Sequence, residues 1–133
     1  MKNKANFLLT LCLCLQTNLF ATDEKKLSDF YEIAKEKCQD IPSIRKEMDR
    51  INEEIILLLT ERTAFVKRAG DLKSKTTKVA DDRVRVQEQE EKIILQSILH
   101  DLPIEISVPV FREIMEHSIR FQQDYIDRNY KQY

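Results

Sequence analysis

Apolar residues recur every three or four positions over a long stretch of the chain. The series consists of Ile44, Met48, Ile51, Ile55, Leu58, Phe65, Ala69 and Leu72. This spacing is that of one face of an α-helix, and it predicts a helix over residues 41–74. At about 1.5 Å per residue this helix is on the order of 45 Å long, which is more than a small single-chain bundle needs. We therefore expect it to pack against a partner chain.

Arg62 stands at the one position where this apolar series is interrupted. A buried guanidinium without a partner costs several kcal/mol, so either an anion meets Arg62 or the apolar face opens to water there. The alternative is that the side chain snorkels, with its apolar stem on the helix face and its charge in solvent. The sequence thus predicts a cationic position within an apolar surface.

Two helices are predicted at the start of the folded region. Leu27, Phe30, Tyr31 and Ala34 fall on one face of a short helix over residues 24–38. Asp40, Pro42 and Ser43 then supply the residue types that begin a helix, and they mark the start of the long one.

Two more helices are predicted towards the C-terminus. The polar segment 73–81 is a connecting loop, and Asp81 or Asp82 is placed to cap a helix over residues 82–100. Pro103 ends that helix, and Ser107 is placed to cap a last helix over residues 108–128. The last helix directs five apolar residues towards a core: Phe111, Ile114, Met115, Phe121 and Tyr125.

The composition agrees with an all-α fold in one domain. The chain has 133 residues, and one glycine and three prolines leave little material for hairpins or glycine-rich phosphate loops. Hydrophobic residues make up 42% of the chain, as in globular proteins. The formal net charge of -1 provides no basic excess, so a nucleic-acid partner is not expected.

The first 21 residues differ from the rest and have the form of a cleavable secretory signal peptide. Lys2 and Lys4 precede the apolar run 7–15, which is too short to span a bilayer, and Ala21 is a suitable cleavage point. We expect a domain at 22–133 that is periplasmic or secreted and has no membrane contact after cleavage. An uncleaved anchor is the alternative, and a lipoprotein is disfavoured because leucine precedes each cysteine of the segment.

The cysteines and histidines do not indicate a metal site. Cleavage after residue 21 would leave Cys38 alone, so the mature chain could form no internal disulfide. His100 and His117 are far apart and belong to no recognisable ligand motif. We interpret both as helix-end or surface residues, and no metal is expected.

Arg62 and Lys73 project from the same face of the long helix. They are 11 residues apart, and 11 steps of about 100° return to within about 20° of the starting direction. Arg45 lies 17 residues before Arg62, which places it about 100° around the helix and some 25 Å away. Arg45 therefore cannot easily join the same pocket from its own helix, but it could join from the equivalent helix of a second chain.

The helices predicted over residues 82–100 and 108–128 also each carry polar residues on one face. Asp82, Arg85 and Gln89 share a face of one helix, and Ser118 and Gln122 share a face of the other. Separately, Asp82 could be only a cap and Ser118 could bond only its own helix. Together with Arg62 and Lys73, they suit a small polyanionic ligand, and catalysis there would rest on orientation and fixed charge rather than on a nucleophile or general base.

Three segments resemble the helices of the all-helical class of chorismate mutases. They are "IRKEMDRINEEIILLLTERTAFVKRAGDLK" (44–73), "DDRVRVQEQ" (81–89) and "FREIMEHSIRFQQ" (111–123), and the signal peptide is similar to that of the family's exported branch. The resemblance implies a three-helix fold with one long N-terminal helix, in an intertwined homodimer. It also implies the rearrangement of chorismate to prephenate, a cofactor-free reaction of aromatic amino-acid biosynthesis.

By the same resemblance, the anion at Arg62 is a carboxylate of the substrate. Arg45 resembles the arginine that dimeric members contribute from the neighbouring subunit. Lys73 and Gln122 match the pair that hydrogen-bonds the ether oxygen, where negative charge develops as the C–O bond breaks. Ser118 matches a further carboxylate contact.

On the second site helix, Asp82 and Arg85 match residues that contact the substrate hydroxyl and hold the site. Cytoplasmic members have a glutamate where this chain has Val86, and Gln89 matches a glutamine of exported members that can serve instead. Two alternatives remain open at this stage: an isochorismate pyruvate lyase of the same fold, and a non-catalytic exported helical dimer. The acid at position 82 favours the mutase over the lyase.

Overall fold

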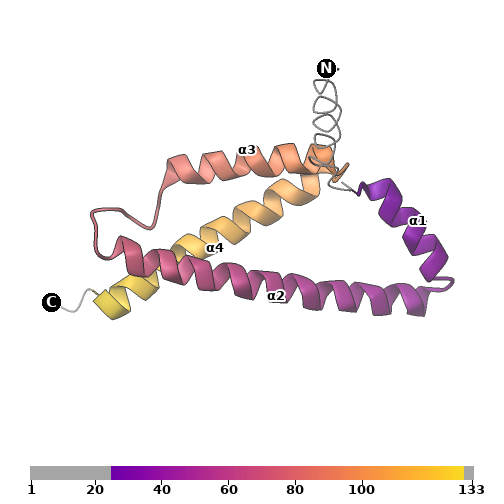
Figure 1. Ribbon diagram of the computed structural model, residues 1–133, viewed down its shortest axis with the longest axis horizontal. Helices are drawn as coiled ribbons and strands as arrows, with labels where there is room; N and C mark the ends of the chain where they lie inside the picture. The colour runs from indigo at the N-terminus through magenta and orange to yellow at the C-terminus, as the bar shows by residue number, and fades with distance from the viewer. Residues whose placement is uncertain (1–24, 131–133) are drawn as a thin grey trace, which may run out of the picture.

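Helices form the whole of the regular structure in residues 25–130, the part of the chain that the computed structural model describes. They are α1 (Leu27–Lys37), α2 (Ile41–Lys73), α3 (Arg83–Leu99) and α4 (Ile104–Tyr130). Figure 1 shows α2 as the long base, with α3 and α4 forming a hairpin above it. The predicted all-α fold, with one long helix and a short extra helix before it, is confirmed. The predicted signal peptide at 1–21 lies outside the described residues.

The starts of α2 and α3 are fixed by the acidic caps that the sequence predicts. The carboxylate of Asp40 accepts a hydrogen bond from the backbone N–H of Ser43 at 2.8 Å, and Pro42 stands in the first turn. The carboxylate of Asp82 accepts from the backbone N–H of Arg85 at 3.1 Å. Each cap satisfies a donor that has no partner within its own helix.

The predicted start of the last helix is wrong. α4 begins at Ile104 rather than at 108, and Pro109 lies inside it. The carbonyl of Pro103 accepts from the backbone N–H groups of Ile106 and Ser107 at 2.9 and 3.2 Å, so the helix starts one turn earlier. Ser107 is no cap, because its buried hydroxyl instead meets that of Ser97 at 2.6 Å and joins α4 to α3.

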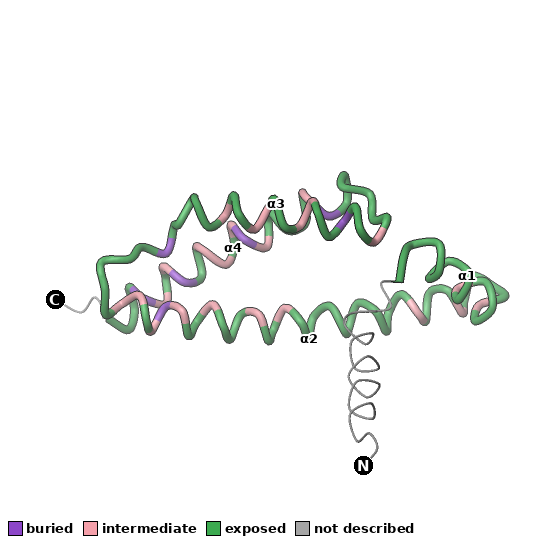
Figure 2. The backbone as a smooth tube through the Cα atoms, turned by 45° about the horizontal axis from the view of Figure 1, so that its top comes forward, coloured by how far each residue is buried: buried purple, intermediate pink, exposed green. Residues whose placement is uncertain are grey.

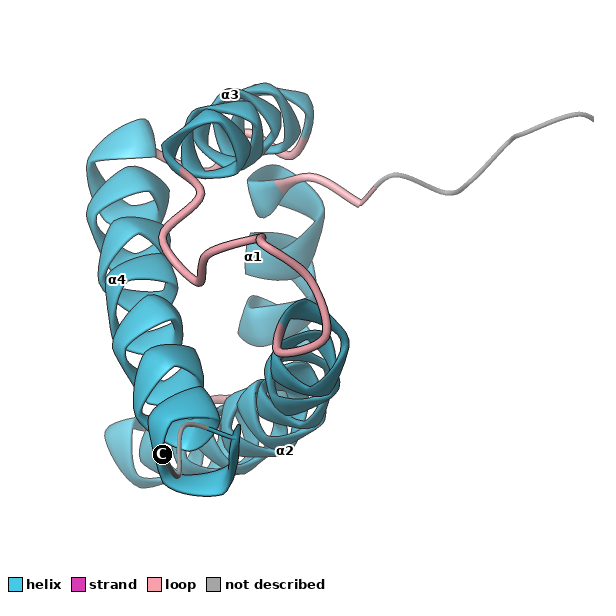
Figure 3. Ribbon diagram, turned by 90° about the vertical axis from the view of Figure 1, so that its left-hand side faces the viewer, coloured by secondary structure: helices cyan, strands magenta, loops and turns pink. Residues whose placement is uncertain are grey.

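α4 is the helix that holds the domain together, because it contacts both α2 and α3. In Figure 3, it runs from α3 at one end to α2 at the other. The buried apolar side chains of this unit are Ala80, Met115 and Ile126. This is a small core for the described part of the chain.

Most of the predicted apolar face of α2 is not covered within one chain. Met48 and Leu58 are 53% and 65% exposed, and Figure 2 shows the first half of α2 largely in the colour of exposed residues. On α4, only Met115 of the five predicted core residues is fully buried, and Phe111 and Phe121 remain exposed. The prediction of a core around Phe111 and Phe121 is thus wrong for the isolated chain, since no other element within residues 25–130 buries them.

α1 is attached at both ends but has no buried residue. The backbone N–H of Leu27 donates to the carbonyl of His100 at 3.0 Å, and the ring of His100 contacts the carbonyl of Lys25 at 2.9 Å. At its other end, Lys37 pairs with Glu47 of α2 at 2.7 Å. α1 therefore spans from the α3–α4 turn to the start of α2, as Figure 1 shows. His100 is the helix-end residue that the sequence predicts.

Within residues 25–130, no helix is long and apolar enough to cross a membrane.

Candidate functional site

A cavity of about 470 Å³ lies between α2, the loop 74–82, α3 and α4. It contains seven of the eight site residues predicted from the sequence: Arg62, Lys73, Asp82, Arg85, Gln89, Ser118 and Gln122. Apolar residues from α2, α3 and α4 complete the wall, and they include Phe65, Val86 and Met115. The volume lies within the range of about 300–1,000 Å³ that is usual for small-molecule sites.

Arg62 enters the cavity from α2 and meets Ser118 of α4. Its guanidinium donates a short hydrogen bond to the hydroxyl of Ser118, and that hydroxyl also donates to the carbonyl of Ile114 on its own helix at 2.6 Å. No carboxylate among residues 25–130 forms an ion pair with Arg62. Burial lowers the pKa of Arg62 from its ordinary value, because a partly desolvated cation is disfavoured. Arg62 therefore does not snorkel, and its charge faces a space that an anion can enter.

Lys73 and Gln122 meet further along the same two helices, about three turns beyond Arg62 on α2 and about one turn beyond Ser118 on α4. The ammonium of Lys73 donates to the amide oxygen of Gln122 at 3.1 Å and to the carbonyl of Ala80 at 3.4 Å. The amide nitrogen of Gln122 donates to the carbonyl of Val66 at 2.6 Å. Because Gln122 is only 5% exposed and both ends of its amide are bonded, its orientation is fixed.

Gly70 allows α2 and α4 to approach closely enough for this contact. A β-carbon at position 70 would lie 3.1 Å from a ring carbon of Tyr125 and 3.5 Å from the γ-carbon of Gln122. The sequence does not single out Gly70, because a glycine inside a helical pattern has no recognisable partner until the fold is known. Its closeness to Gln122 makes it part of the support of the site.

A hydrogen-bonded cluster next to Gly70 holds the ends of α2 and α4 together. The carboxylate of Asp71 accepts from the hydroxyls of Tyr125 and Tyr130 at 2.6 and 2.8 Å. These two bonds lower the pKa of Asp71 and, conversely, the first of them raises the pKa of Tyr125. The sequence shows no signal for this cluster, since Asp71 is more than 50 residues from either tyrosine.

The face of α3 contributes a carboxylate and an arginine. Asp82 does act as a cap, as the simpler interpretation has it, but it also lines the cavity. The guanidinium of Arg85 pairs with Glu88 at 3.0 Å. The amide of Gln89 lies against the same guanidinium, and in the orientation that satisfies both groups its oxygen accepts at 2.6 Å. Gln89 thus contacts Arg85, while Val86 brings no charge to the wall.

Arg45 does not belong to this cavity within one chain. It is exposed near the start of α2, and its 17-residue separation from Arg62 corresponds to about 25 Å along the helix. This position agrees with the sequence argument that Arg45 cannot reach the pocket from its own α2.

The charges of the cavity wall favour an anionic ligand. Arg62, Lys73 and Arg85 are cations, and Asp82 is the one carboxylate among the lining residues. The wall contains no cysteine or histidine. His117 is exposed, as the sequence analysis expects, and its ring lies 3.7 Å from the carboxylate of Glu113. No group of three metal-ligand side chains occurs among residues 25–130.

Comparison with known proteins covers α2, α3 and most of α4. The family model described as chorismate mutase type II matches residues 44–123, which leaves out α1. The chain is 35% identical over 88 residues to the bifunctional chorismate mutase/prephenate dehydratase of Aquifex aeolicus, covering 64% of this chain and 24% of that protein. It therefore spans about a quarter of that relative's length.

A second relative is matched over most of its own length. The chain is 24% identical over 89 residues to the chorismate mutase of Methanocaldococcus jannaschii, covering 67% of this chain and 90% of the relative. No solved structure matches the chain. Because the family model covers more than half of the sequence and all three helices that build the cavity, the chain belongs to the chorismate mutase type II family.

Proposed function

We propose that this chain rearranges chorismate to prephenate, a pericyclic shift within one molecule that needs no cofactor. One observation carries the proposal: the ammonium of Lys73 and the amide of Gln122 meet at 3.1 Å in the cavity that Arg62 also enters. Family membership supports it, as do two relatives whose names include this activity.

The charge of the cavity fits an anionic substrate. A substrate carboxylate at Arg62 and Ser118 would give the partly buried guanidinium the anionic partner that it lacks within the described chain. A charge-assisted hydrogen bond of this kind is about twice as strong as a neutral one. Binding of the carboxylate therefore orients the substrate at this end of the cavity.

Lys73 and Gln122 each have one N–H group that is not engaged within residues 25–130 and can bind the oxygen of the C–O bond that breaks. An ammonium has three N–H groups, and Ala80 and Gln122 accept two of those of Lys73. An amide nitrogen has two, and Val66 accepts one of those of Gln122. The two remaining donors suit the ether oxygen, where negative charge develops as the C–O bond lengthens. Stabilising that charge lowers the barrier without any proton transfer.

The remaining catalytic effect comes from holding one substrate conformation. The carboxylate of Asp82 accepts a hydrogen bond from the substrate hydroxyl. The guanidinium of Arg85, held by the amide of Gln89, faces the substrate from α3. Since both reacting ends belong to one molecule, confinement in a reactive conformation removes much of the entropic barrier. The proposed reaction therefore needs neither a nucleophile nor a metal.

The test is turnover of chorismate by the purified chain. We expect chorismate to disappear and prephenate to form at equal rates, with no added cofactor and with no loss in EDTA. A folded protein that leaves chorismate unchanged contradicts the proposal. Isochorismate is assayed in parallel. A protein that releases pyruvate from isochorismate but leaves chorismate unchanged is a lyase. A protein that is inactive on both substrates is a non-catalytic helical protein.

We further propose that the working form is a homodimer in which Arg45 of a second copy completes the site. Two observations support this: the apolar face of α2 is uncovered within one chain, and Arg45 is exposed and remote from the cavity. Burial of that face against a second α2 supplies the stabilisation that three buried apolar side chains do not.

We also propose that residues 1–21 direct the chain to the periplasm or the outside of the cell. The support is the sequence pattern of two lysines, a short apolar run and Ala21. The intact mass of the protein recovered from its native compartment tests this. We expect the mass of a chain that begins at Thr22. A cytoplasmic protein that retains residues 1–21 would contradict the proposal.

A further inference from the structure

The loop between α2 and α3 supplies two groups to the cavity, although it is not helical itself. The carbonyl of Ala80 accepts from Lys73, and Asp82 lines the wall while capping α3. Both are backbone or short side-chain groups, so their positions depend directly on the path of the loop. Some contact must therefore fix the loop relative to α4, which carries Ser118 and Gln122.

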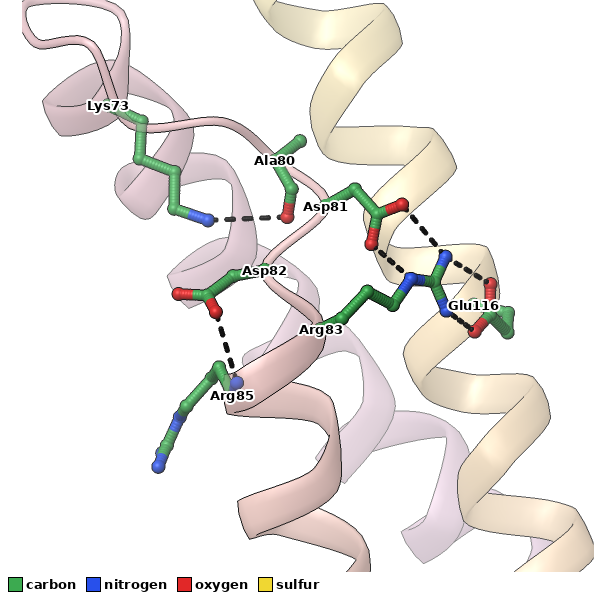
Figure 4. Close-up of polar contacts among 7 residues, drawn as sticks. All are labelled: Lys73, Ala80, Asp81, Asp82, Arg83, Arg85 and Glu116. Carbon is green, nitrogen blue, oxygen red and sulfur yellow. Dashed lines mark hydrogen bonds and ion pairs between the residues drawn. The ribbon is translucent and has the colours of Figure 1, made fainter.

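Arg83 provides that contact. Its guanidinium pairs with Asp81 at 2.5 Å on one side, and with Glu116 of α4 at 2.5 Å on the other. Second contacts reach Asp81 at 3.0 Å and Glu116 at 3.4 Å, so both carboxylates are held in two-point geometry. Figure 4 shows the guanidinium between the two carboxylates, one from the loop and one from α4.

The side chains of residues 81, 82 and 83 point alternately towards α4 and away from it. Asp82 has extended backbone angles, and in extended backbone successive side chains point in opposite directions. Asp81 and Arg83 therefore face α4, while Asp82 between them is directed elsewhere. In Figure 4 its carboxylate lies on the side of Lys73 and Arg85, away from the Arg83–Glu116 pair.

We propose that Arg83 is a positioning residue of the active site, acting through Asp82 and the carbonyl of Ala80. It does not line the cavity, and it rests on Glu116, which is two residues before Ser118 on α4. The Asp81–Arg83–Glu116 cluster thus sets the loop groups at a fixed distance from the α4 groups. The inference rests on the proposed function, because it assigns Arg83 a part in the same reaction.

A matched control is available on the same pair of helices. Arg112 of α4 pairs with Glu90 of α3 at 2.6 Å, and its side chain is 53% exposed against 58% for Arg83. Both ion pairs link α3 to α4, but only that of Arg83 involves the loop. If Arg83 merely joins two helices, then Arg83→Gln and Arg112→Gln should have equal effects.

The experiment compares kcat and KM for chorismate in the full chain and these two variants, each corrected for its folded fraction. We expect Arg83→Gln to lower kcat/KM about tenfold, because displacement of catalytic groups by ~1 Å can cost about 100-fold. Arg112→Gln should stay within about twofold of the unaltered chain, since its ion pair with Glu90 joins the two helices without holding the loop. Arg83→Lys should recover only part of the loss, because an ammonium cannot engage two carboxylates bidentately.

Testing Arg83→Gln in a protein that already carries a substitution at Asp82 shows whether Arg83 acts through Asp82. Asp82→Asn removes the carboxylate but keeps a good capping residue. In this background, Arg83→Gln should cost less than it does in the unaltered chain, as expected for coupled residues. Equal losses for Arg83→Gln and Arg112→Gln, or full additivity with Asp82→Asn, would overturn the inference.

Hydrogen exchange separates failure of this inference from failure of the proposed function. The amides of residues 79–86 should exchange faster in Arg83→Gln than in Arg112→Gln, whether or not the protein turns over chorismate. If the unaltered chain is inactive but the exchange difference is present, the proposed function is wrong and the ordering role of Arg83 stands. Identical exchange in the two variants contradicts that role.

Discussion

The ammonium of Lys73 and the amide oxygen of Gln122 are 3.1 Å apart, although 49 residues separate them in the sequence. The contact exists because α4 lies against the C-terminal end of α2, where Gly70 leaves room for it. Each residue also bonds a backbone carbonyl, so the pair is held from both sides. This arrangement places two donors at one point of the cavity without help from a ligand.

Replacing Lys73 with methionine should reduce turnover rather than binding. The side chain keeps its length and loses its charge, so the developing negative charge on the ether oxygen is less stabilised. Since that charge is larger in the transition state than in the bound substrate, the loss should fall on kcat more than on KM. Steady-state kinetics on chorismate measure the split. A Lys73→Met protein with normal kcat would remove Lys73 from the mechanism.

Arg62→Leu should preserve or increase stability while activity collapses. The substitution restores the apolar series of α2 and removes a partly desolvated cation. Losing a charged hydrogen bond to a buried substrate group costs about 2–5 kcal/mol, or roughly 30-fold to several thousand-fold in rate.

Thermal unfolding and kcat/KM are measured together for this variant, with Arg68→Leu as the control on the same helix. Arg68 is exposed and outside the cavity, so that variant should remain active. If Arg62→Leu is well folded and turns over chorismate normally, the carboxylate contact is not at Arg62.

Mixing two inactive variants tests whether the site is shared between chains. Arg45→Ala and Arg62→Ala should each be inactive, and subunit exchange between them should restore part of the activity. The reason is that one of the two sites in a mixed dimer then receives both arginines intact. Activity after mixing is compared with each variant alone, and exchange is verified by mass spectrometry of differently labelled chains. Absence of recovery after verified exchange would show that each site is built from one chain.

Gly70→Ala should lower both stability and activity. Alanine is favoured over glycine in a helix by about 1 kcal/mol, but its β-carbon would lie 3.1 Å from the ring of Tyr125. Overpacking of this kind costs about 1–3 kcal/mol, and relief requires α4 to move away from α2. The same movement lengthens the Lys73–Gln122 contact. Unfolding midpoints and kcat for the two proteins provide the test, and a more stable, fully active Gly70→Ala would contradict it.

Protonation of Asp71 should weaken the join between α2 and α4 at acidic pH. Its pKa is lowered below the ordinary 3.8, first by the hydroxyl of Tyr125 and then by that of Tyr130. A lowered pKa means that the stabilisation is fully present above the unfolded-state value and is lost as pH falls through the folded-state value. Urea unfolding measured from about pH 5 to about pH 2, a range around that ordinary value, should show a smaller acid-induced loss of stability for Asp71→Asn than for the unaltered chain. Equal losses in the two proteins would exclude Asp71 as a source of the pH dependence.

The sequence predicts the parts of the site that follow from helix geometry. Arg62 is detectable because it interrupts an apolar series, and Lys73 because 11 residues return to the same face. Asp82 is detectable as a cap. All three lie where this reasoning places them, in one cavity. Their roles towards chorismate stay predictions until the kinetic experiments are done.

Other features depend on contacts between distant segments and have no local signal. Arg83 and Glu116 are 33 residues apart, and nothing in either neighbourhood indicates the other. The start of α4 was mispredicted for a related reason, since the buried partner of Ser107 is Ser97 on another helix. A local pattern identifies a residue that suits a helix cap, but only packing decides whether its hydroxyl is already engaged.

The single glycine of the chain also has a consequence for the unfolded state. Glycine loses more backbone freedom on folding than any other residue, and it widens the range of conformations open to an unfolded chain. This sequence has one glycine in 133 residues, and that one serves helix packing rather than a turn. The unfolded ensemble is therefore more restricted than that of an average chain of the same length. Folding consequently costs less entropy per residue, which partly offsets the small number of apolar side chains that one copy buries.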